Sequence, residues 1–276
     1  MRTVSATAGR SIRKKIWTSL EANAYRLIGQ KNLTGRHLLA CASGGLDSTA
    51  LLNVLSALAK TCKLKVTVAH VHHGDANSDP VARDARGDSG YRDRAAAFVA
   101  EQAENLGFGF VLGRAEGSPA SEAELRKARY LELQKIKLQT GAQLLTLAHH
   151  RDDLLETRLI RLIRGVGPEG LKSMSILNGN RFRPFLQTPR VLLEDYLNEI
   201  SAGWLEDPSN ESDGALRNWI RLQWLPQLER KRPGAGQALA RSLEALTLTQ
   251  NHTWVRGYFD QNGIQRGRLN ELGPLE

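Results

Sequence analysis

The chain has 276 residues, which is enough for one large domain and a smaller appendage. Lys and Arg (38) outnumber Asp and Glu (29), and the formal charge of +9 favours acidic partners such as RNA or DNA. The two cysteines, Cys41 and Cys62, have no paired spacing, which argues against a disulfide framework, an iron–sulfur site and a zinc site. A reducing cytosol fits this usage, and no apolar run approaches the length that crosses a bilayer.

The first residues, 1–15, are rich in Arg, Lys, Ser and Thr and free of acid, a composition that also fits an organelle transit peptide. Ile12, Ile16 and Leu20, however, belong to an amphipathic pattern that runs almost to the first predicted strand. We therefore expect residues 11–29 to be part of the fold. Only residues 1–10 are expected to be disordered and dispensable.

A glycine-containing stretch, 42–49, lies between a short apolar run at 37–41 and a helical pattern at 48–60. We predict a strand, a glycine turn and a helix that packs one side on a sheet. Unpaired N–H groups and the positive end of the helix dipole would point into the turn, which favours an anion. Gly44 and Gly45 would let a phosphate approach the main chain closely.

The charged residue of this stretch is Asp47, and the chain contains no Walker sequence to capture a β/γ-phosphate with a lysine. A carboxylate repels a phosphate unless a hard cation such as Mg²⁺ lies between them, so Asp47 is a candidate metal ligand. Ser43 and Ser48 add hydroxyl donors. The string from 43 to 48 resembles the Ser-Gly-Gly-x-Asp-Ser signature of the pyrophosphatase-loop (PP-loop) family, whose members cleave ATP into AMP and pyrophosphate. The alternative is an ordinary strand-to-helix turn that needs glycine.

Polar residues follow the next predicted strand, 64–69, in the order His70-Val71-His72-His73-Gly74. Three histidines could bind a metal, but two of them share a strand face and nothing nearby completes a four-ligand set. Contact of His73 and Gly74 with a nucleotide is the better prediction. The stretch 75–94 has almost no aliphatic residue and is predicted to be a mobile surface loop.

A strand is predicted at 108–112, and a helix begins near Ser121, which forms a capping-box pattern with Glu124. Arg126 and Arg129 are three residues apart on this helix and share a face. A guanidinium fork fits a carboxylate or a phosphate, so either arginine could bind one of these groups. The alternative is a solvated charged face.

A strand at 144–148 ends in the polar residues 149–153, and a helix follows at once. Asp153 and Glu156 share a face in its first turn. Acids there can simply complement the helix dipole, which is worth roughly 0.3–1 kcal/mol each. Ligands of parallel sheets, however, bind beyond the carboxyl ends of the strands, where three polar strand ends converge in this chain. We therefore predict a functional role for the acid pair.

The rest of the chain reads as mostly helical. We predict a basic extended stretch at 181–186, a helix at 191–200, a polar loop at 204–210, a helix from Arg217 that Pro226 interrupts, a basic linker at 230–234 and a last helix at 238–248.

Taken together, these stretches resemble the tRNA(Ile)-lysidine synthetases over about residues 36–233. The motifs are Ser43-Gly44-Gly45-Leu46-Asp47-Ser48, His70 to Gly74, Glu122-Ala123 through Arg126 to Arg129-Tyr130, His149 to Asp153 with Glu156-Thr157, Arg164 to Gly167, Trp204 to Asn210, and Arg217-Asn218. The resemblance implies an α/β fold with a parallel, doubly wound sheet, Rossmann-like and of the adenine nucleotide alpha-hydrolase type, and a helical C-terminal appendage. Residues 1–228 would form the PP-loop ATP-binding catalytic domain and residues 229–276 a small helical extension.

The same resemblance implies a reaction in which lysine is ligated to C2 of the wobble cytidine of tRNA(Ile) with a CAU anticodon. ATP would first adenylate the C2 oxygen, and AMP and pyrophosphate would be released. The implied ATP-binding residues are Ser43, Gly44, Gly45, Leu46, Asp47, Ser48, His73 and Gly74. The implied catalytic residues are Asp47, Asp153, Glu156, Arg126, Arg129 and Arg217. Asp47 would hold Mg²⁺, and the acid pair would recognise and orient the lysine amine, with one acid as a candidate base.

The implied partners are tRNA(Ile), L-lysine, ATP and Mg²⁺ in the cytoplasm, with no membrane and with a homodimer inferred from relatives. Two departures from the family are a longer 75–94 loop and a shorter C-terminal region than in larger members. One alternative is a related PP-loop tRNA-modifying enzyme such as a thiolase, against which the unpaired cysteines argue. Another is adenylation of a different acceptor, and a third is an RNA-binding relative without catalysis.

Overall fold

The computed structural model describes residues 17–72, 90–115, 122–206, 216–248, 259–260 and 263–264. These residues form two compact units, unit 1 from residues 1–152 and 175–211 and unit 2 from residues 153–174 and 212–276. The predicted nucleotide contacts His73 and Gly74 lie outside the described residues, as do residues 1–16 and the greater part of the 75–94 loop.

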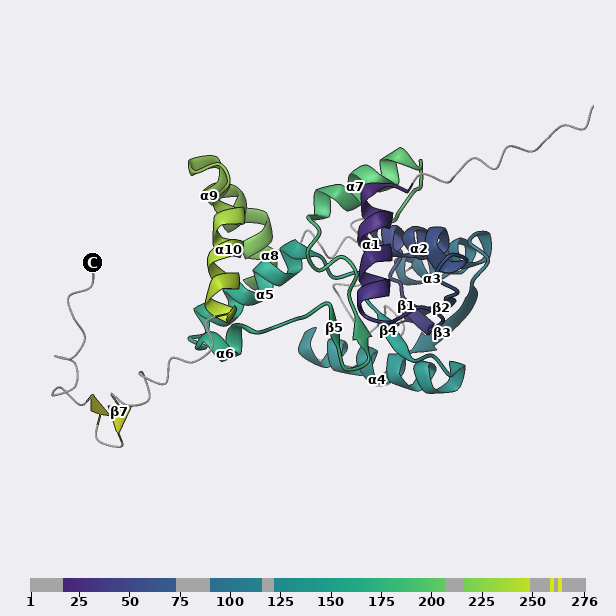
Figure 1. Ribbon diagram of the computed structural model, residues 1–276, viewed down its shortest axis with the longest axis horizontal. Helices are drawn as coiled ribbons and strands as arrows, with labels where there is room; N and C mark the ends of the chain where they lie inside the picture. The colour runs from purple at the N-terminus through teal and green to yellow at the C-terminus, as the bar shows by residue number, and fades with distance from the viewer. Residues whose placement is uncertain are drawn as a thin grey trace, which may run out of the picture. The chain divides into compact units, whose positions relative to one another are not determined.

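Unit 1 contains a six-stranded sheet (Figure 1). In spatial order the strands are β3 (Gly109–Arg114), β2 (Lys65–His72), β1 (His37–Cys41), β4 (Leu144–Thr146), β6 (Arg181–Phe182) and β5 (Leu177–Asn178). All neighbours are parallel except β5, which is antiparallel to β6. The predicted parallel α/β sheet is therefore confirmed. Because the strand order reverses between β1 and β4, their carboxyl ends form the crevice where open α/β sheets bind ligands.

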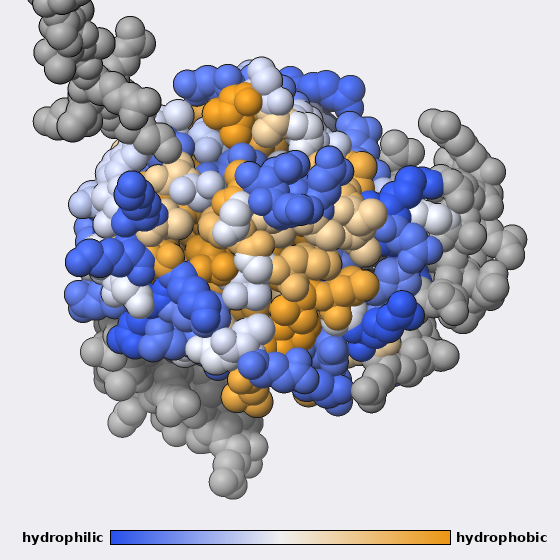
Figure 2. Space-filling model, turned by 90° about the vertical axis from the view of Figure 1, so that its right-hand side faces the viewer, coloured by the Kyte–Doolittle hydropathy of each residue, from blue (hydrophilic) through white to orange (hydrophobic). Residues whose placement is uncertain are grey.

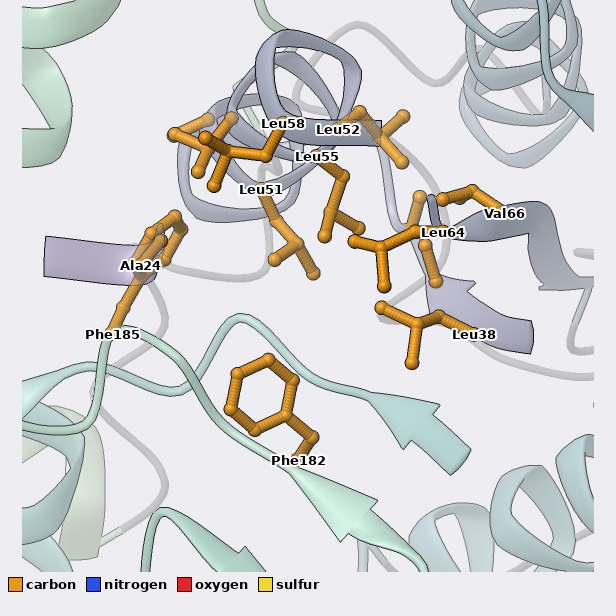
Figure 3. Close-up of a cluster of buried hydrophobic side chains, with 14 of the residues drawn as sticks. Ala24, Leu38, Leu51, Leu52, Leu55, Leu58, Leu64, Val66, Phe182 and Phe185 are labelled. Atoms are coloured by element: carbon orange, nitrogen blue, oxygen red, sulfur yellow. The ribbon is translucent and has the colours of Figure 1, made fainter. Parts of the chain in front are cut away.

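Helices cover both faces of this sheet because side chains alternate along each strand. Leu38 of β1 belongs to a core cluster that includes residues of α1 (Ser19–Gln30), α2 (Leu46–Ala59), α3 (Tyr91–Asn105) and α7 (Arg190–Glu199) (Figures 1 and 3). Leu39, one residue later, belongs to a second cluster with Ile136 of α4 (Glu122–Thr140) on the opposite face. The sheet is therefore held rigid from both sides, so its carboxyl edge is a fixed platform for the site.

The surface of unit 1 is not uniformly polar, and hydrophobic side chains gather on the face shown in Figure 2. At the edge of the sheet, Leu112 of β3 is 43% exposed. Among the helices of the described part of the chain, none is long and apolar enough to span a membrane.

Unit 2 is mainly helical, as predicted for the C-terminal part of the chain. Its helices are α5 (Arg151–Ile163, from Asp153 onward), α6 (Pro168–Leu171), α8 (Leu216–Trp219), the π-helical η4 (Ile220–Trp224), α9 (Leu225–Lys231) and α10 (Ala235–Leu248). A two-stranded ladder of β7 (Phe259–Asp260) and β8 (Gly263–Ile264) follows them in the chain. The apolar core of the unit joins Leu155, Leu159, Leu171, Ile220 and Leu243.

Pro226 does not interrupt the helix that contains it, contrary to the sequence prediction. Residues 216–231 stay helical, and the turn before the proline widens so that the N–H of Leu225 bonds to the carbonyl of Ile220, five residues back. Proline lacks an N–H and crowds the carbonyl four residues earlier, so one wide π-turn lets the helix continue. The predicted basic linker at 230–234 forms a tight turn, in which the Glu229 carboxylate accepts hydrogen bonds from the N–H groups of Gly234 and Gly236.

The grouping into units differs from the boundary near residue 228 that the sequence suggested. Leu243 of α10 shares a core with Leu155 of α5 and Ile220 of η4, so the last helix packs with segments that precede residue 228. Packing of this kind depends on residues far apart in the sequence, so the sequence of the linker does not reveal it. The predicted division into parts that fold separately, 1–228 and 229–276, stays a prediction.

Candidate active site

The turn between β1 and α2 is closed by the Ser48 hydroxyl, which is buried inside it. Ser48 Oγ lies 3.2 Å from the N–H of Ser43 and 3.1 Å from that of Gly44, both of which donate to it. The hydroxyl itself donates to the carbonyl of Gly45 at 3.0 Å. Ser48 therefore fixes the shape of the loop from within, whereas Ser43 is exposed at its rim.

Buried His70 holds the start of the same loop. Its Nδ1 lies 2.9 Å from the carbonyl of Ala42, so Nδ1 carries the proton and donates to that oxygen. Burial lowers the pKa of His70, and the nearby His72 acts in the same direction, while the bond to Ala42 opposes them. His70 is thus a neutral structural residue at the edge of the loop.

The amino end of α2 is open, unlike that of α1. Helix α1 begins with a complete capping box, in which Thr18 and Glu21 bond to each other's backbone N–H groups. Helix α2 begins after Gly45, and within the described residues no side chain caps it. Its first N–H groups and its dipole therefore remain available to an anion.

The two loop glycines have different reasons to be glycine. Gly44 has φ +90°, a left-handed conformation that disfavours any side chain. Gly45 has φ −74°, and among the described residues a Cβ there would meet Ser43 Oγ at 3.6 Å and the Leu205 carbonyl at 3.9 Å. Neither a positive φ nor crowding by the described residues requires glycine at position 45, although glycine suits the N-cap of α2. The close approach of a ligand is a second physical reason for it.

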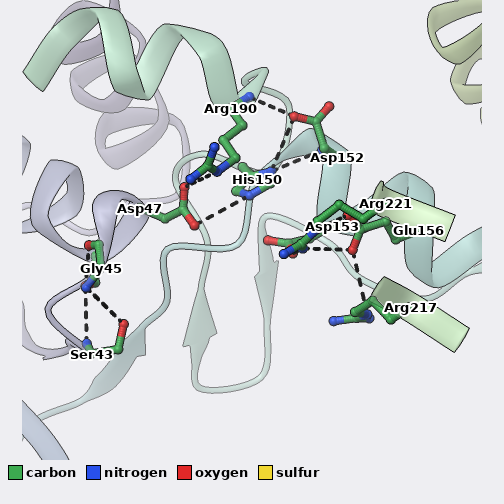
Figure 4. A network of polar contacts seen from close by, with 11 residues as sticks. Ser43, Gly45, Asp47, His150, Asp152, Asp153, Glu156, Arg190, Arg217 and Arg221 are labelled. Carbon is green, nitrogen blue, oxygen red and sulfur yellow. Dashed lines mark hydrogen bonds and ion pairs between the residues drawn. The ribbon is translucent and has the colours of Figure 1, made fainter. Parts of the chain in front are cut away.

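Asp47 lies between two basic side chains of unit 1 (Figure 4). His150 is almost fully buried, and its Nδ1 accepts the N–H of Asp152 at 3.2 Å, which leaves the proton of the neutral ring on Nε2. That Nε2 lies 3.6 Å from Asp47 Oδ2. Arg190 Nε lies 3.5 Å from Asp47 Oδ1, and its backbone N–H donates to Asp152 Oδ2 at 2.9 Å.

The surroundings of Asp47 fit an oxygen-bound divalent cation that a substrate helps to hold. Asp47 Oδ1 is buried and has no hydrogen-bond partner among the described residues, although the carboxylate as a whole is 34% exposed. Within the described part of the chain, no three His, Cys, Asp or Glu side chains form a metal-binding group. Mg²⁺ is bound by one or two carboxylates together with phosphate oxygens and waters, so a single Asp47 suffices for it.

The predicted acid pair meets two arginines within unit 2 (Figure 4). Arg221 forks onto the Glu156 carboxylate, with Nε at 2.6 Å from Oε1 and an Nη at 2.9 Å from Oε2, and it also reaches Asp153 at 3.3 Å. Arg217 lies 3.7 Å from Glu156 and donates to Thr157 at 2.7 Å. The Glu156 side chain is only 2% exposed, so these cations balance a buried charge.

The two predicted arginines of α4 have different surroundings in unit 1. The Arg126 guanidinium lies 5.4 Å from the centre of the Tyr130 ring. Arg129 lies close enough to Cys41, the last residue of β1, for its charge to act on the thiol; burial nevertheless raises the pKa of Cys41 to about 12. Both arginines are exposed.

The structure thus brings the predicted residues into two groups. Unit 1 joins Ser43, Gly44, Gly45, Leu46, Asp47 and Ser48 at the carboxyl edge of the sheet, and unit 2 joins Asp153, Glu156 and Arg217. The sequence reading missed His150, Arg190 and Arg221. The sequence contains a pattern that could have identified two of these residues, because His150 follows a strand and Arg221 is four residues from Arg217. No pattern in the sequence indicates the contact of Arg190 with Asp47.

Comparison with known proteins gives a match of residues 18–228 to a family model described as a PP-loop domain. A tRNA(Ile)-lysidine synthase of Bdellovibrio bacteriovorus is 37% identical over 264 residues, which are 93% of this chain and 79% of that protein. A tRNA(Ile)-lysidine synthase of Alkalilimnicola ehrlichii is 37% identical over 208 residues, 72% of this chain. The chain spans only 43% of that second relative's length.

Among solved structures, the U34-tRNA thiolase NcsA from Methanococcus maripaludis with its [4Fe-4S] cluster aligns with a TM-score of 0.65. The alignment covers 84% of this chain and 80% of the thiolase at 16% sequence identity. At that identity the likeness concerns the fold, and it agrees with the sheet described above.

Proposed function

The chain belongs to the tRNA(Ile)-lysidine synthase family of PP-loop proteins, and from that premise we propose that it ligates lysine to C2 of the wobble cytidine of a CAU-anticodon tRNA(Ile). The observation that carries the proposal is the loop of residues 43–48. Within the described residues, a helix end without a side-chain cap, a glycine with room for a closely approaching ligand and a carboxylate whose buried Oδ1 accepts no hydrogen bond lie together there. Each of these features has a use when a polyphosphate binds.

The first step is the attack of the C2 oxygen of cytidine on the α-phosphorus of ATP. The bond between the α- and β-phosphates breaks, and pyrophosphate leaves against the N–H groups at the start of α2. Asp47 would hold Mg²⁺, which would offset the charge that builds up on the leaving group. Arg190 and His150 keep the Asp47 carboxylate in place from both sides.

The second step is the attack of the lysine ε-amine on C2, which expels AMP together with the former C2 oxygen. The ammonium must first be bound and lose a proton, which suits the acid pair of Asp153 and Glu156. Arg217 would contact the reacting phosphate or nucleotide, and Arg126 or Arg129 would bind the lysine carboxylate or a phosphate. For lysine to bind at the acid pair, the Arg221 fork would have to give up at least one of its bonds to these acids.

Thiolase chemistry that uses the chain's own sulfur is disfavoured by its two cysteines. Both are free, and burial raises the pKa of each thiol, to about 12 for Cys41. Neither is therefore a ready thiolate nucleophile. Free thiols also accord with the cytoplasmic location that we include in the proposal. A homodimer, which would enlarge the surface for tRNA, is part of the same proposal.

The deciding experiment incubates the protein with ATP, Mg²⁺, radiolabelled lysine and a CAU-anticodon transcript, with a UAU-anticodon transcript as the matched control. We expect label on the CAU transcript alone, with one AMP and one pyrophosphate released per lysine transferred. Asp47→Ala and Asp153→Asn should abolish transfer while the melting temperature shows that the variants fold. Folded wild-type protein that labels neither transcript would refute the proposal, and pyrophosphate release with another RNA acceptor would redirect it.

A further inference from the structure

Three arginines of unit 1 surround a single tyrosine beside α4 and β6. We call Arg126, Tyr130, Arg181 and Arg183 the arginine–tyrosine cluster. The guanidinium carbons of Arg126 and Arg181 lie 5.4 and 4.8 Å from the centre of the Tyr130 ring. Arg183 is buried and donates to His149 Nδ1 and to the carbonyl of Ser175.

Two distant segments are held together to build this cluster. Arg126 and Tyr130 lie on α4, whereas Arg181 lies on β6, opposite Leu145 of β4. The amide of Asn180, just before β6, donates to Gln134 of α4 at 3.1 Å, which ties the β5–β6 turn to the helix. The cluster is therefore preorganised and does not depend on two mobile side chains meeting by chance.

Among the described residues, no acid balances the charges of Arg126 and Arg181. Within the described residues, neither Arg126 nor Arg181 forms an ion pair with a carboxylate. Burial lowers the pKa of Arg183, and the charges of Arg181 and Arg126 add to this effect, while Tyr130 opposes it. Three like charges with one aromatic ring among them repel one another, so an anion that binds there would relieve the repulsion.

The position of the cluster indicates which anion this is. Arg183 reaches His149, which follows β4, and β4 is the neighbour of β1, from which the loop of residues 43–48 projects. Arg183 thus connects the cluster to the edge of unit 1 that carries the predicted pyrophosphate site, whereas Arg181 begins β6. Tyr130 is half-buried. Arginine forks beside an aromatic ring are characteristic of proteins that bind single-stranded RNA, where the forks hold phosphates.

We propose that the arginine–tyrosine cluster binds the sugar-phosphate backbone of the substrate RNA beside the reacting nucleotide, with Arg181 as a phosphate contact. The inference deepens the proposed function and rests on it for the identity of the RNA. The inference assigns Arg181 to RNA binding and not to lysine binding. A contact between Arg181 and an RNA phosphate depends on the charge of the side chain and does not require lysine.

The test uses Arg181→Gln, with Arg26→Gln as the matched control. Arg26 is an exposed arginine on α1, whose buried residues belong to the core on the sheet face opposite α4. Dissociation constants for the CAU-anticodon transcript are measured at several salt concentrations, without ATP or lysine. Arg181→Gln should weaken binding about five- to tenfold and reduce the slope of log K against log salt by about one, whereas Arg26→Gln should leave both nearly unchanged. Arg181→Lys, which keeps the charge, should retain the wild-type slope.

The melting temperature provides a second measurement, which would change if the role of Arg181 were purely structural. Because Arg181 has no acidic partner in the described part of the chain, Arg181→Gln should keep the wild-type melting temperature. Wild-type affinity and slope in Arg181→Gln would overturn the inference, as would a raised KM for lysine with unchanged RNA binding. Wild-type protein that binds the transcript but transfers no lysine would refute the proposed function alone, since the binding measurement needs no catalysis. Protein that binds no RNA would refute both.

Discussion

The two glycines of the loop at 43–48 allow the role of the fold to be separated from the role of the ligand. Gly44→Ala places a side chain at φ +90°, where the left-handed backbone costs roughly 1–2 kcal/mol. Gly45→Ala places one at φ −74° with ordinary contacts of 3.6 and 3.9 Å, so it adds no backbone strain and loses only the preference for Gly over Ala at a helix N-cap, about 0.5–1 kcal/mol. The two variants differ by one methyl group each.

The two variants rank in opposite order for stability and for ATP binding. At roughly 2–4 °C per kcal/mol for a chain of this size, Gly44→Ala should melt about 2–8 °C below the wild type, and Gly45→Ala only about 1–4 °C below it. The methyl group at position 45 would displace a phosphate from N–H donors whose bonds to a charged group are worth about 1.5–3 kcal/mol each. Gly45→Ala should therefore weaken ATP binding by about 10- to 100-fold.

Differential scanning fluorimetry and ATP titration calorimetry measure the two quantities on the same protein samples. Gly45→Ala that binds ATP within twofold of the wild type would refute the reasoning, because no ligand would then explain that glycine. Gly45→Ala that melts as low as Gly44→Ala would show that the fold needs both glycines.

Two further predictions concern buried charge and pH. Arg221→Gln should lower the free energy of unfolding by about 1–3 kcal/mol, because Glu156 stays buried and, among the described residues, keeps only the cation of Arg217 near it. Glu156→Gln in the same chain should restore part of the loss in a double-mutant cycle, and additive effects in urea denaturation would contradict the pairing. The pKa of His70 is lowered by burial, so the unfolded chain binds more protons below about pH 6.5 and the wild type should lose stability as the pH falls from 7 to 5. His70→Asn, whose amide can still donate to Ala42, should show a shallower decline in melting temperature over that range, and an unchanged decline would show that His70 does not cause it.

The local sequence pattern was sufficient to predict much of the fold. The strand at 37–41 is confirmed at its predicted bounds, and the helix after the glycine loop begins only two residues before its predicted start. Both follow from hydrophobic periodicity and glycine placement, which act over a few residues and are visible in the sequence. Pro226 was misread because the effect of a proline depends on whether the surrounding helix is held by tertiary contacts, here the packing of Ile220 in the unit 2 core.

The sequence by itself determined the strand, glycine loop and helix around residues 43–48, the placement of Asp153 and Glu156 on one helix, and the family, because each depends on residue types at fixed short spacing. Only the tertiary structure decided the partners of these residues, namely Arg190 beside Asp47, Arg221 on Glu156 and Arg181 over Tyr130. Ion pairs and ring contacts join segments that packing brings together, and packing depends on the burial of the whole core. No local spacing specifies which distant side chain fills the position next to a charge.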